Sequence, residues 1–152
     1  MKTIAVHSPI GGSGKTTIAR ALHQAKGYGY QSIDPLYPEV TGSTDVGLVI
    51  DCSPHWEPEI EQAVGAADVL LVPLKSIPEW MWPDLTRRLL QVLAVRENKQ
   101  TIIFRTDPAK DFAGFYKRLQ SIKRPGVHLI TEIVDVRAGQ WDATQLAKLA
   151  LD

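Results

Sequence analysis

Short apolar runs alternate along the chain with segments in which apolar residues recur every three or four positions. The runs are typical of buried strands, and the recurring pattern is typical of helices. Strands are predicted over Thr3–His7, Tyr30–Asp34, Gly47–Cys52, Val69–Leu74, Thr101–Arg105 and Val127–Ile130. Helices are predicted over Lys15–Lys26, Pro58–Ala67, Pro83–Glu97, Ala109–Ser121 and Gln140–Leu151. This alternation predicts an α/β fold with a parallel sheet and helices on both faces, and ligands at the carboxyl ends of the strands.

Length and composition narrow the class of protein. The 152 residues suit one domain, which we take to span 1–152. The formal net charge is zero, so no overall positive field draws the chain to nucleic acid or membranes. Cys52 is the only cysteine, which excludes an intramolecular disulfide. A single cysteine suits a reducing compartment, so we expect a cytoplasmic protein. Since no apolar run approaches the length of a membrane span, we also expect no direct membrane insertion.

A glycine-rich loop lies between the first predicted strand and the first predicted helix, in the segment HSPIGGSGKTT. Such a loop can wrap an anion, because its N–H groups and the positive end of the helix converge on one point. Lys15 adds a charge there and Thr16 adds a hydroxyl for a metal ion. The pattern predicts a site for a nucleotide di- or triphosphate with Mg²⁺, with these cofactor-binding residues: Gly11, Gly12, Ser13, Gly14, Lys15, Thr16 and Thr17. Pro9 breaks the strict G-x-x-x-x-G-K-[ST] pattern, so an ordinary strand-to-helix turn is the alternative.

Two aspartates end predicted strands and are the candidate acidic partners of this loop. Asp51 closes the strand in GLVIDCSP, where a carboxylate would lie on the metal side of a phosphate site. Asp34 closes the weaker strand in YQSIDP. The alternatives are that Asp51 caps the following helix and that Asp34 belongs to an Asp-Pro turn.

The segments HSPIGGSGKTT, SIDP, VIDCSP and AADVLLVPL, in this order, resemble the ParA/MinD family of deviant Walker ATPases. The resemblance implies a P-loop fold with a Rossmann-like, three-layer architecture. It implies that Lys15, Asp34 and Asp51 serve catalysis, that Thr16 and Asp51 serve the magnesium ion, and that Asp34 orients the attacking water.

The resemblance also implies adenine contacts at the loop after the fifth strand, with Arg105 and Asp107 as candidates. Members of this family dimerise with ATP and position cargo such as plasmid DNA, chromosomes or protein complexes. We therefore expect an ATP-dependent homodimer that hydrolyses ATP.

Two departures from the family bear on activity. The family carries a lysine that reaches the partner's phosphates where this chain has Ile10, so we expect weak hydrolysis. We expect Ile10 to pack against the partner subunit instead. The segment between Asp34 and Asp51 is short for the family, so surfaces for partners are reduced.

Two surface features leave alternatives open. The cluster Trp80–Trp82 is typical of a contact surface for a dimer or a partner protein, although core packing explains it equally well. Basic residues could bind DNA nonspecifically or could lie on solvated helix faces; they are Arg87, Arg88, Arg96, Lys99, Lys117, Arg118, Lys123 and Arg124.

Two other functions compete with the ATP-driven switch. One is a module that binds nucleotide without turnover, which Ile10 favours. The other is a small-molecule kinase or ligase of the dethiobiotin-synthetase type, for which the sequence reveals no acceptor-binding cluster.

Overall fold

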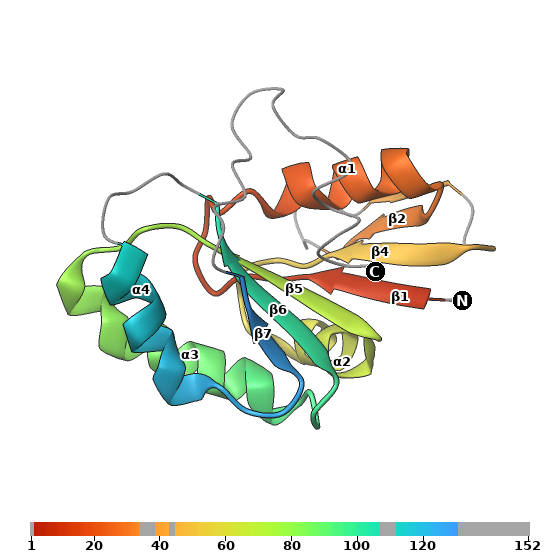
Figure 1. Ribbon diagram of the computed structural model, residues 1–152. Coiled ribbons are helices and arrows are strands. Elements are labelled where there is room, and N and C mark those ends of the chain that lie inside the picture. The colour runs from red at the N-terminus through yellow and green to blue at the C-terminus, as the bar shows by residue number, and fades with distance from the viewer. Residues whose placement is uncertain (1, 34–38, 43–44, 107–111, 131–152) are drawn as a thin grey trace.

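The computed structural model describes residues 2–33, 39–42, 45–106 and 112–130. They form one seven-stranded sheet in the order β3-β2-β4-β1-β5-β6-β7 (Figure 1). Its neighbouring strands are parallel, except that β3 runs antiparallel to β2. The strands are β1 (Lys2–Val6), β2 (Gly29–Ser32), β3 (Glu39–Thr41), β4 (Gly47–Asp51), β5 (Val69–Leu74), β6 (Gln100–Arg105) and β7 (Val127–Leu129). The predicted α/β class with a mostly parallel sheet is therefore confirmed.

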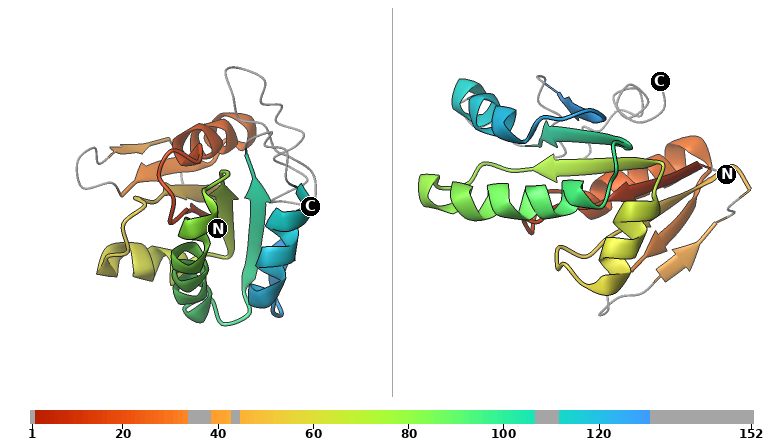
Figure 2. Two further views of the ribbon diagram at one scale, coloured as in Figure 1. Left: turned by 90° about the vertical axis from the view of Figure 1, so that its left-hand side faces the viewer. Right: turned by 90° about the horizontal axis from the view of Figure 1, so that it is seen from below.

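Helices cover both faces of this sheet, as predicted. The helix α1 (Lys15–Lys26) lies on one face, and the helices α2, α3 and α4 lie on the other (Figure 2). The latter span Pro58–Ala66, Trp82–Ala94 and Phe112–Leu119, and single 3-10 turns occupy Glu79–Met81 (η1) and Gln120–Ile122 (η2). Among the described residues, no helix is long and apolar enough to cross a membrane.

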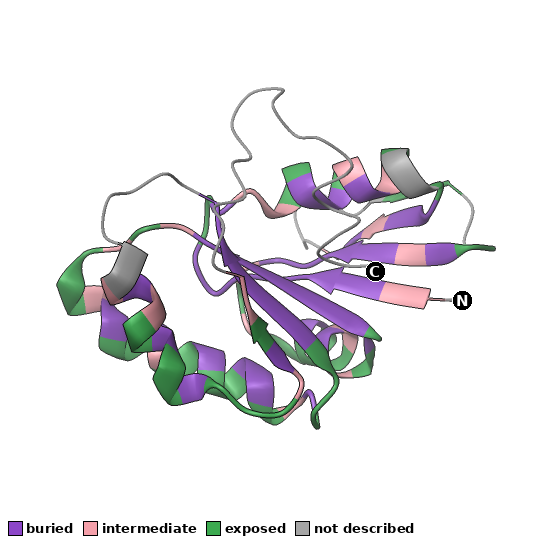
Figure 3. Ribbon diagram, viewed as in Figure 1, coloured by how far each residue is buried: buried purple, intermediate pink, exposed green. Residues whose placement is uncertain are grey.

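Two apolar clusters fill the spaces between the layers. Because successive strand residues face opposite sides, Ile4 and Val6 pack under α1 while Ala5 belongs to the cluster beneath α2, α3 and α4. All of β5 is buried, as Figure 3 shows for the centre of the sheet. A strand covered on both faces has no solvent side, which explains the continuous apolar run in Val69–Leu74.

The observed bounds of some helices and strands match the prediction, and those of others differ. The bounds of α1 match, since Gly14 and Gly27 flank it in the left-handed conformation. The third helix ends at Ala94, before the positive φ angles of Glu97 (49°) and Asn98 (66°). Sequence patterns missed β3, a three-residue edge strand. The predicted helix over 140–151 lies outside the described residues.

Candidate functional site

The loop between β1 and α1 has the backbone that its glycines allow. Gly12 and Gly14 have φ angles of 74° and 86°, a region that other residues rarely adopt. Gly14 precedes α1 and no side chain caps this helix end. The first turn of α1 also contains no acidic residue. Within the described helix start, neither the cap residue nor the first turn supplies a side-chain acceptor that would compete with an anion for these N–H groups.

Buried hydroxyl groups hold the loop in shape. Ser13 Oγ donates to Ile10 O at 2.8 Å, and Ile10 N donates to Ser8 Oγ at 3.2 Å. The two serine hydroxyls also contact each other at 3.3 Å, and both side chains are fully buried. Ser13 thus braces the loop, so its side chain is turned inward and only its backbone is left for a ligand.

The side chain of Ile10 packs within its own chain. It is 9% exposed and belongs to the apolar cluster beneath α2, α3 and α4. Little of this side chain remains for the partner contact expected from the sequence. Its position explains why an apolar residue suits this site, since a lysine there would have to leave the core.

Asp51 and Thr16 meet at the carboxyl edge of the sheet. The Thr16 hydroxyl donates to Asp51 Oδ2 at 2.8 Å, and the Tyr30 hydroxyl donates to the same oxygen at 2.8 Å. The parallel register places Asp51 beside Val6, the last residue of β1, and leaves the carboxylate 6% exposed. The residue that precedes α2 is Glu57, so the alternative that Asp51 caps this helix is wrong.

The other predicted site residues have different surroundings. Lys15 and Gly14 are half-buried at the start of α1, and Gly11 and Thr17 are exposed. Asp34 and Asp107 lie outside the described residues, so their roles stay predictions.

Arg105 ends β6 in a buried position, with its guanidinium carbon 5.3 Å from the ring centre of Phe115. This contact gives Arg105 a packing role on the face of α4. A contact between Arg105 and adenine stays a prediction.

The two tryptophans of the predicted contact surface, Trp80 and Trp82, differ in their burial. Trp82 is 7% exposed and packs edge-on against Phe115, with the ring centres 5.7 Å apart. Trp80 is 78% exposed, and Met81 is half-buried. Core packing therefore accounts for Trp82, and Trp80 is the part of this cluster that remains on the surface.

The basic residues do not form one cationic face. Arg96 is 1% exposed and serves the interior. Arg87 and Arg88 both pair with Asp84, and Arg118 pairs with Glu79. These pairs support the interpretation of solvated helix faces for much of the set. Nonspecific DNA binding stays a prediction.

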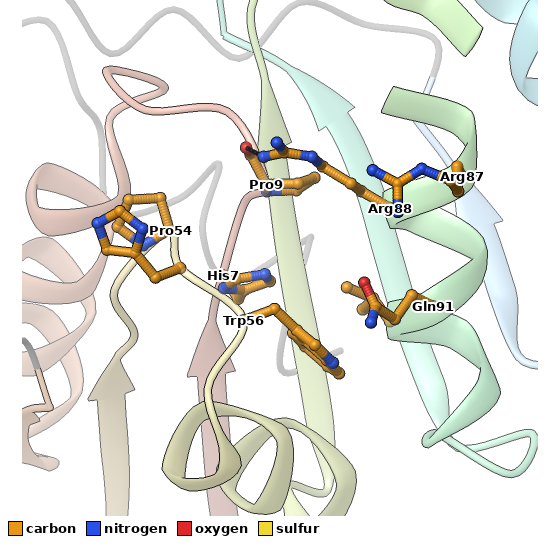
Figure 4. Close-up of a pocket in the computed structure, with 9 residues that line it drawn as sticks. His7, Pro9, Pro54, Trp56, Arg87, Arg88 and Gln91 are labelled. Atoms are coloured by element: carbon orange, nitrogen blue, oxygen red, sulfur yellow. Dashed lines mark hydrogen bonds between the residues drawn. The ribbon is translucent and has the colours of Figure 1, made fainter. Parts of the chain in front are cut away.

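A polar cavity of about 280 Å³ lies beside the glycine loop, on the face of α2 and α3 (Figure 4). Three segments far apart in the sequence form it: the end of β1 with the loop, the segment after β4, and α3. Arg88 Nη1 donates to Pro9 O at 3.3 Å and joins α3 to the loop. Sequence reasoning missed this cluster, because its polar members share no spacing pattern; they are His7, His55, Arg87, Arg88 and Gln91.

His7 lies at the floor of this region and is almost fully buried. Its Nδ1–H donates to Ser53 O at 3.0 Å, and its ring centre lies 5.6 Å from that of Trp56. The pKa of His7 is lowered to about 4, mainly by burial; the hydrogen bond with Ser53 opposes this shift, and the charge of Lys15 adds to it. His7 is therefore neutral at physiological pH.

This burial predicts a loss of stability in acid. Because the pKa of His7 is about 4 in the folded state and 6.5 as a model value, the unfolded chain binds its proton first as pH falls through this window. We expect His7 to remove roughly 3 kcal/mol from the free energy of unfolding by the lower limit of the window. The variant His7→Asn, which keeps a donor for Ser53 but does not titrate, should lose less stability over the same range.

Urea denaturation of both proteins from neutral pH toward about pH 4 measures this difference. Carboxylates titrate in both proteins, so their effect cancels in the comparison. Equal pH dependence in the two proteins would contradict a buried, neutral His7.

Cys52 follows Asp51 and is 1% exposed. Burial raises the pKa of its thiol to about 12, with the charge of Asp51 adding to the effect. Cys52 therefore packs as a small apolar residue, and its thiol has no nucleophilic role at neutral pH.

No protein-family model and no curated protein sequence matches this chain. The fold and the site define a class: an α/β protein with a mostly parallel, Rossmann-like sheet and a glycine loop at its carboxyl edge. A group of three or more His, Cys, Asp or Glu side chains able to hold a metal ion is absent from the described residues. A metal ion at the loop would therefore depend on Thr16, Asp51 and oxygen atoms of a ligand.

Proposed function

We propose that this protein is a nucleotide-dependent switch of the ParA/MinD type, which binds ATP with Mg²⁺ at the glycine loop and hydrolyses it slowly. The observation that carries this proposal is the contact of Thr16 Oγ1 with Asp51 Oδ2 at 2.8 Å. It joins the first turn of α1 to the end of β4 at the carboxyl edge of the sheet. This edge is where open parallel sheets bind ligands.

The donor set fits a magnesium ion. Thr16 and Tyr30 donate to the same oxygen of Asp51, so the other carboxylate oxygen, Oδ1, receives no hydrogen bond from a described residue. Hydroxyl and carboxylate oxygens are the ligands that Mg²⁺ prefers, often through water. When bound, the ion would neutralise negative charge on the phosphates. Asp51 would hold the metal-bound water, and Thr16 would contribute its hydroxyl.

The remaining parts of the loop would bind the phosphates. The uncapped N–H groups of α1 and the backbone of Gly12 and Gly14 offer donors, and Lys15 adds a full positive charge at the same helix end. The bracing of the loop by Ser8 and Ser13 supports a preorganised cradle, because hydrogen bonds within the chain hold the backbone of the loop in place.

Replacing Asp51 by asparagine tests this function. The amide is of similar size and its oxygen still accepts from Thr16 or Tyr30, so we expect the fold to survive. The negative charge is lost, and we expect Mg²⁺-dependent ATP affinity to fall by at least about tenfold. Calorimetric titration with ATP and ADP, with and without Mg²⁺, measures the change.

The control Glu61→Gln removes an exposed carboxylate of α2 and should have no effect. If Asp51→Asn kept both the Mg²⁺ dependence and the preference for ATP over ADP, the switch assignment would be wrong.

A second candidate function is a small-molecule kinase or ligase, and the cavity of Figure 4 favours it. This cavity joins the glycine loop and is lined by Arg87, Arg88 and Gln91, side chains suited to an acidic acceptor. Phosphate release with water alone, and sedimentation with ADP and ATP, separate the alternatives. A switch releases phosphate slowly and associates with ATP. A kinase requires an acceptor, and a binding module without turnover releases none.

A further inference from the structure

A second lysine reaches the glycine loop from a neighbouring strand. Lys75 directly follows β5, which pairs with β1, so both strands end at the same edge of the sheet (Figure 1). A Cβ atom built on Gly12 would lie 3.2 Å from Lys75 Nζ. The ammonium group is therefore in contact with the loop, at one of its two positive-φ glycines.

None of the described residues neutralises the charge of Lys75. Its side chain is half-buried, and no hydrogen bond or ion pair joins it to another residue in the described part of the chain. Lys75 and Asp84 both line a second cavity, of about 460 Å³, which is distinct from the one in Figure 4. However, Asp84 Oδ1 accepts from Arg87 at 2.6 Å, and Asp84 Oδ2 lies 3.0 Å from Arg88 Nε. The carboxylate that could pair with Lys75 is thus already engaged by two arginines.

The positive charge of Lys75 at this loop causes electrostatic repulsion, which an anionic ligand would remove. Lys75 Nζ lies against the loop, where the backbone N–H groups at the start of α1 carry further partial positive charge. Positive groups placed this close to one another repel. An anion with several negative oxygens, such as a triphosphate, would satisfy all of them together.

We propose that Lys75 binds the terminal phosphoryl group of ATP and stabilises the charge that develops when that group is transferred to water. This inference rests on the proposed function. In the reaction, the water oxygen forms a bond to the γ-phosphorus, and the bond from the γ-phosphorus to the β–γ bridging oxygen breaks. ADP leaves with the electron pair of that bond, and the proton lost by water passes to solvent. Lys75 offsets negative charge on the phosphoryl oxygens through this step.

The proposal explains why position 10 carries isoleucine and no lysine. The cation comes from the end of β5 in the same chain, so position 10 can serve the apolar core. Turnover per subunit is then expected to stay constant as protein concentration rises, because no group from a second copy is required.

The variant Lys75→Gln tests this role, with Lys123→Gln as the control for loss of an exposed lysine. We expect the affinity for ATP to fall about tenfold while the affinity for ADP, which lacks the terminal group, changes little. We expect phosphate release at saturating ATP to fall by about a hundredfold. Lys75→Arg keeps the charge and should restore the preference for ATP. Calorimetry and a phosphate-release assay over a wide protein concentration series supply the readouts.

The outcomes separate this inference from the function on which it rests. If the wild-type protein bound neither ATP nor ADP, both would be overturned. If the wild type bound ATP, and Lys75→Gln kept the ratio of ATP to ADP affinity, the role of Lys75 would be overturned and the proposed function would stand. A rate per subunit that rose steeply with protein concentration would also contradict the role of Lys75, because the cation would then come from a second copy.

Discussion

Replacing Lys15 by alanine is expected to abolish detectable binding of ATP with Mg²⁺, through a loss of affinity of at least about a hundredfold. Lys15 is the first residue of α1, at the helix end where no side chain caps the backbone. Its ammonium adds the full charge that this helix end lacks, and a phosphate site depends on that charge. Alanine is a good helix former, so the helix itself should persist.

Calorimetric titration with ATP measures this loss, and circular dichroism shows whether the variant is folded. Lys117→Ala, an exposed lysine of α4, is the matched control and should bind as the wild type does. Unchanged ATP affinity in a folded Lys15→Ala protein would remove the basis for a nucleotide site at the glycine loop.

The second prediction with a large expected effect concerns Arg96, which lies at the amino-terminal edge of the sheet, opposite the glycine loop. Arg96 follows α3, is 1% exposed and donates to backbone oxygens from three segments. Nη1 donates to Val64 O at 2.6 Å and to Ala67 O at 2.5 Å, and Nη2 donates to Gln100 O at 2.7 Å. Nε donates to Thr101 Oγ1 at 3.2 Å. One guanidinium therefore ties together the end of α2, the segment before β5 and the start of β6.

Burial lowers the pKa of Arg96 to about 10, against the opposing charge of Asp68, so the side chain remains charged at neutral pH. The oxygens of Val64 and Ala67 lie at the C-terminal end of α2, where a cation is favoured. The carbonyl oxygens stabilise the buried guanidinium charge. In return, the guanidinium gives these oxygens hydrogen-bond donors that they would otherwise lack in the interior.

We therefore expect Arg96→Met to lower the free energy of unfolding by about 3–5 kcal/mol, because methionine fills similar space but leaves several buried acceptors unpaired. Urea denaturation followed by circular dichroism measures the change. Arg124→Met, which removes an exposed arginine, should stay within about 0.5 kcal/mol of the wild type. A loss below about 1 kcal/mol for Arg96→Met would mean that water replaces the guanidinium at these carbonyl groups.

Much of the fold could be predicted from the sequence because its signals are local. The buried strands read as continuous apolar runs, and α1 was predicted with its observed bounds because glycines mark both ends. The same local logic made Thr16 and Asp51 candidates, one at a helix start and the other at a strand end. The edge strand β3 was missed because three residues paired with a single neighbour leave too short a pattern.

Several side chains could not be placed from the sequence. Arg96 belonged to the expected set of basic surface residues, yet it lies in the interior because carbonyl groups from distant segments receive it. Trp80 and Trp82 are two positions apart, yet Trp80, in η1, is exposed, and Trp82, the first residue of α3, is buried against Phe115. Nothing near Ile10 in the sequence revealed that its side chain joins the core.

The sequence by itself determined the unit of strand, glycine loop and helix, because periodicity and the left-handed glycine conformation depend on neighbours along the chain. The tertiary structure decided which groups meet at that loop. The strand order places β4 and β5 on either side of β1, and this brings Asp51 to Thr16 and Lys75 to Gly12. Strand order follows from packing both faces of the whole sheet, and a contact between residues so far apart in the chain leaves no mark on the residues around either one.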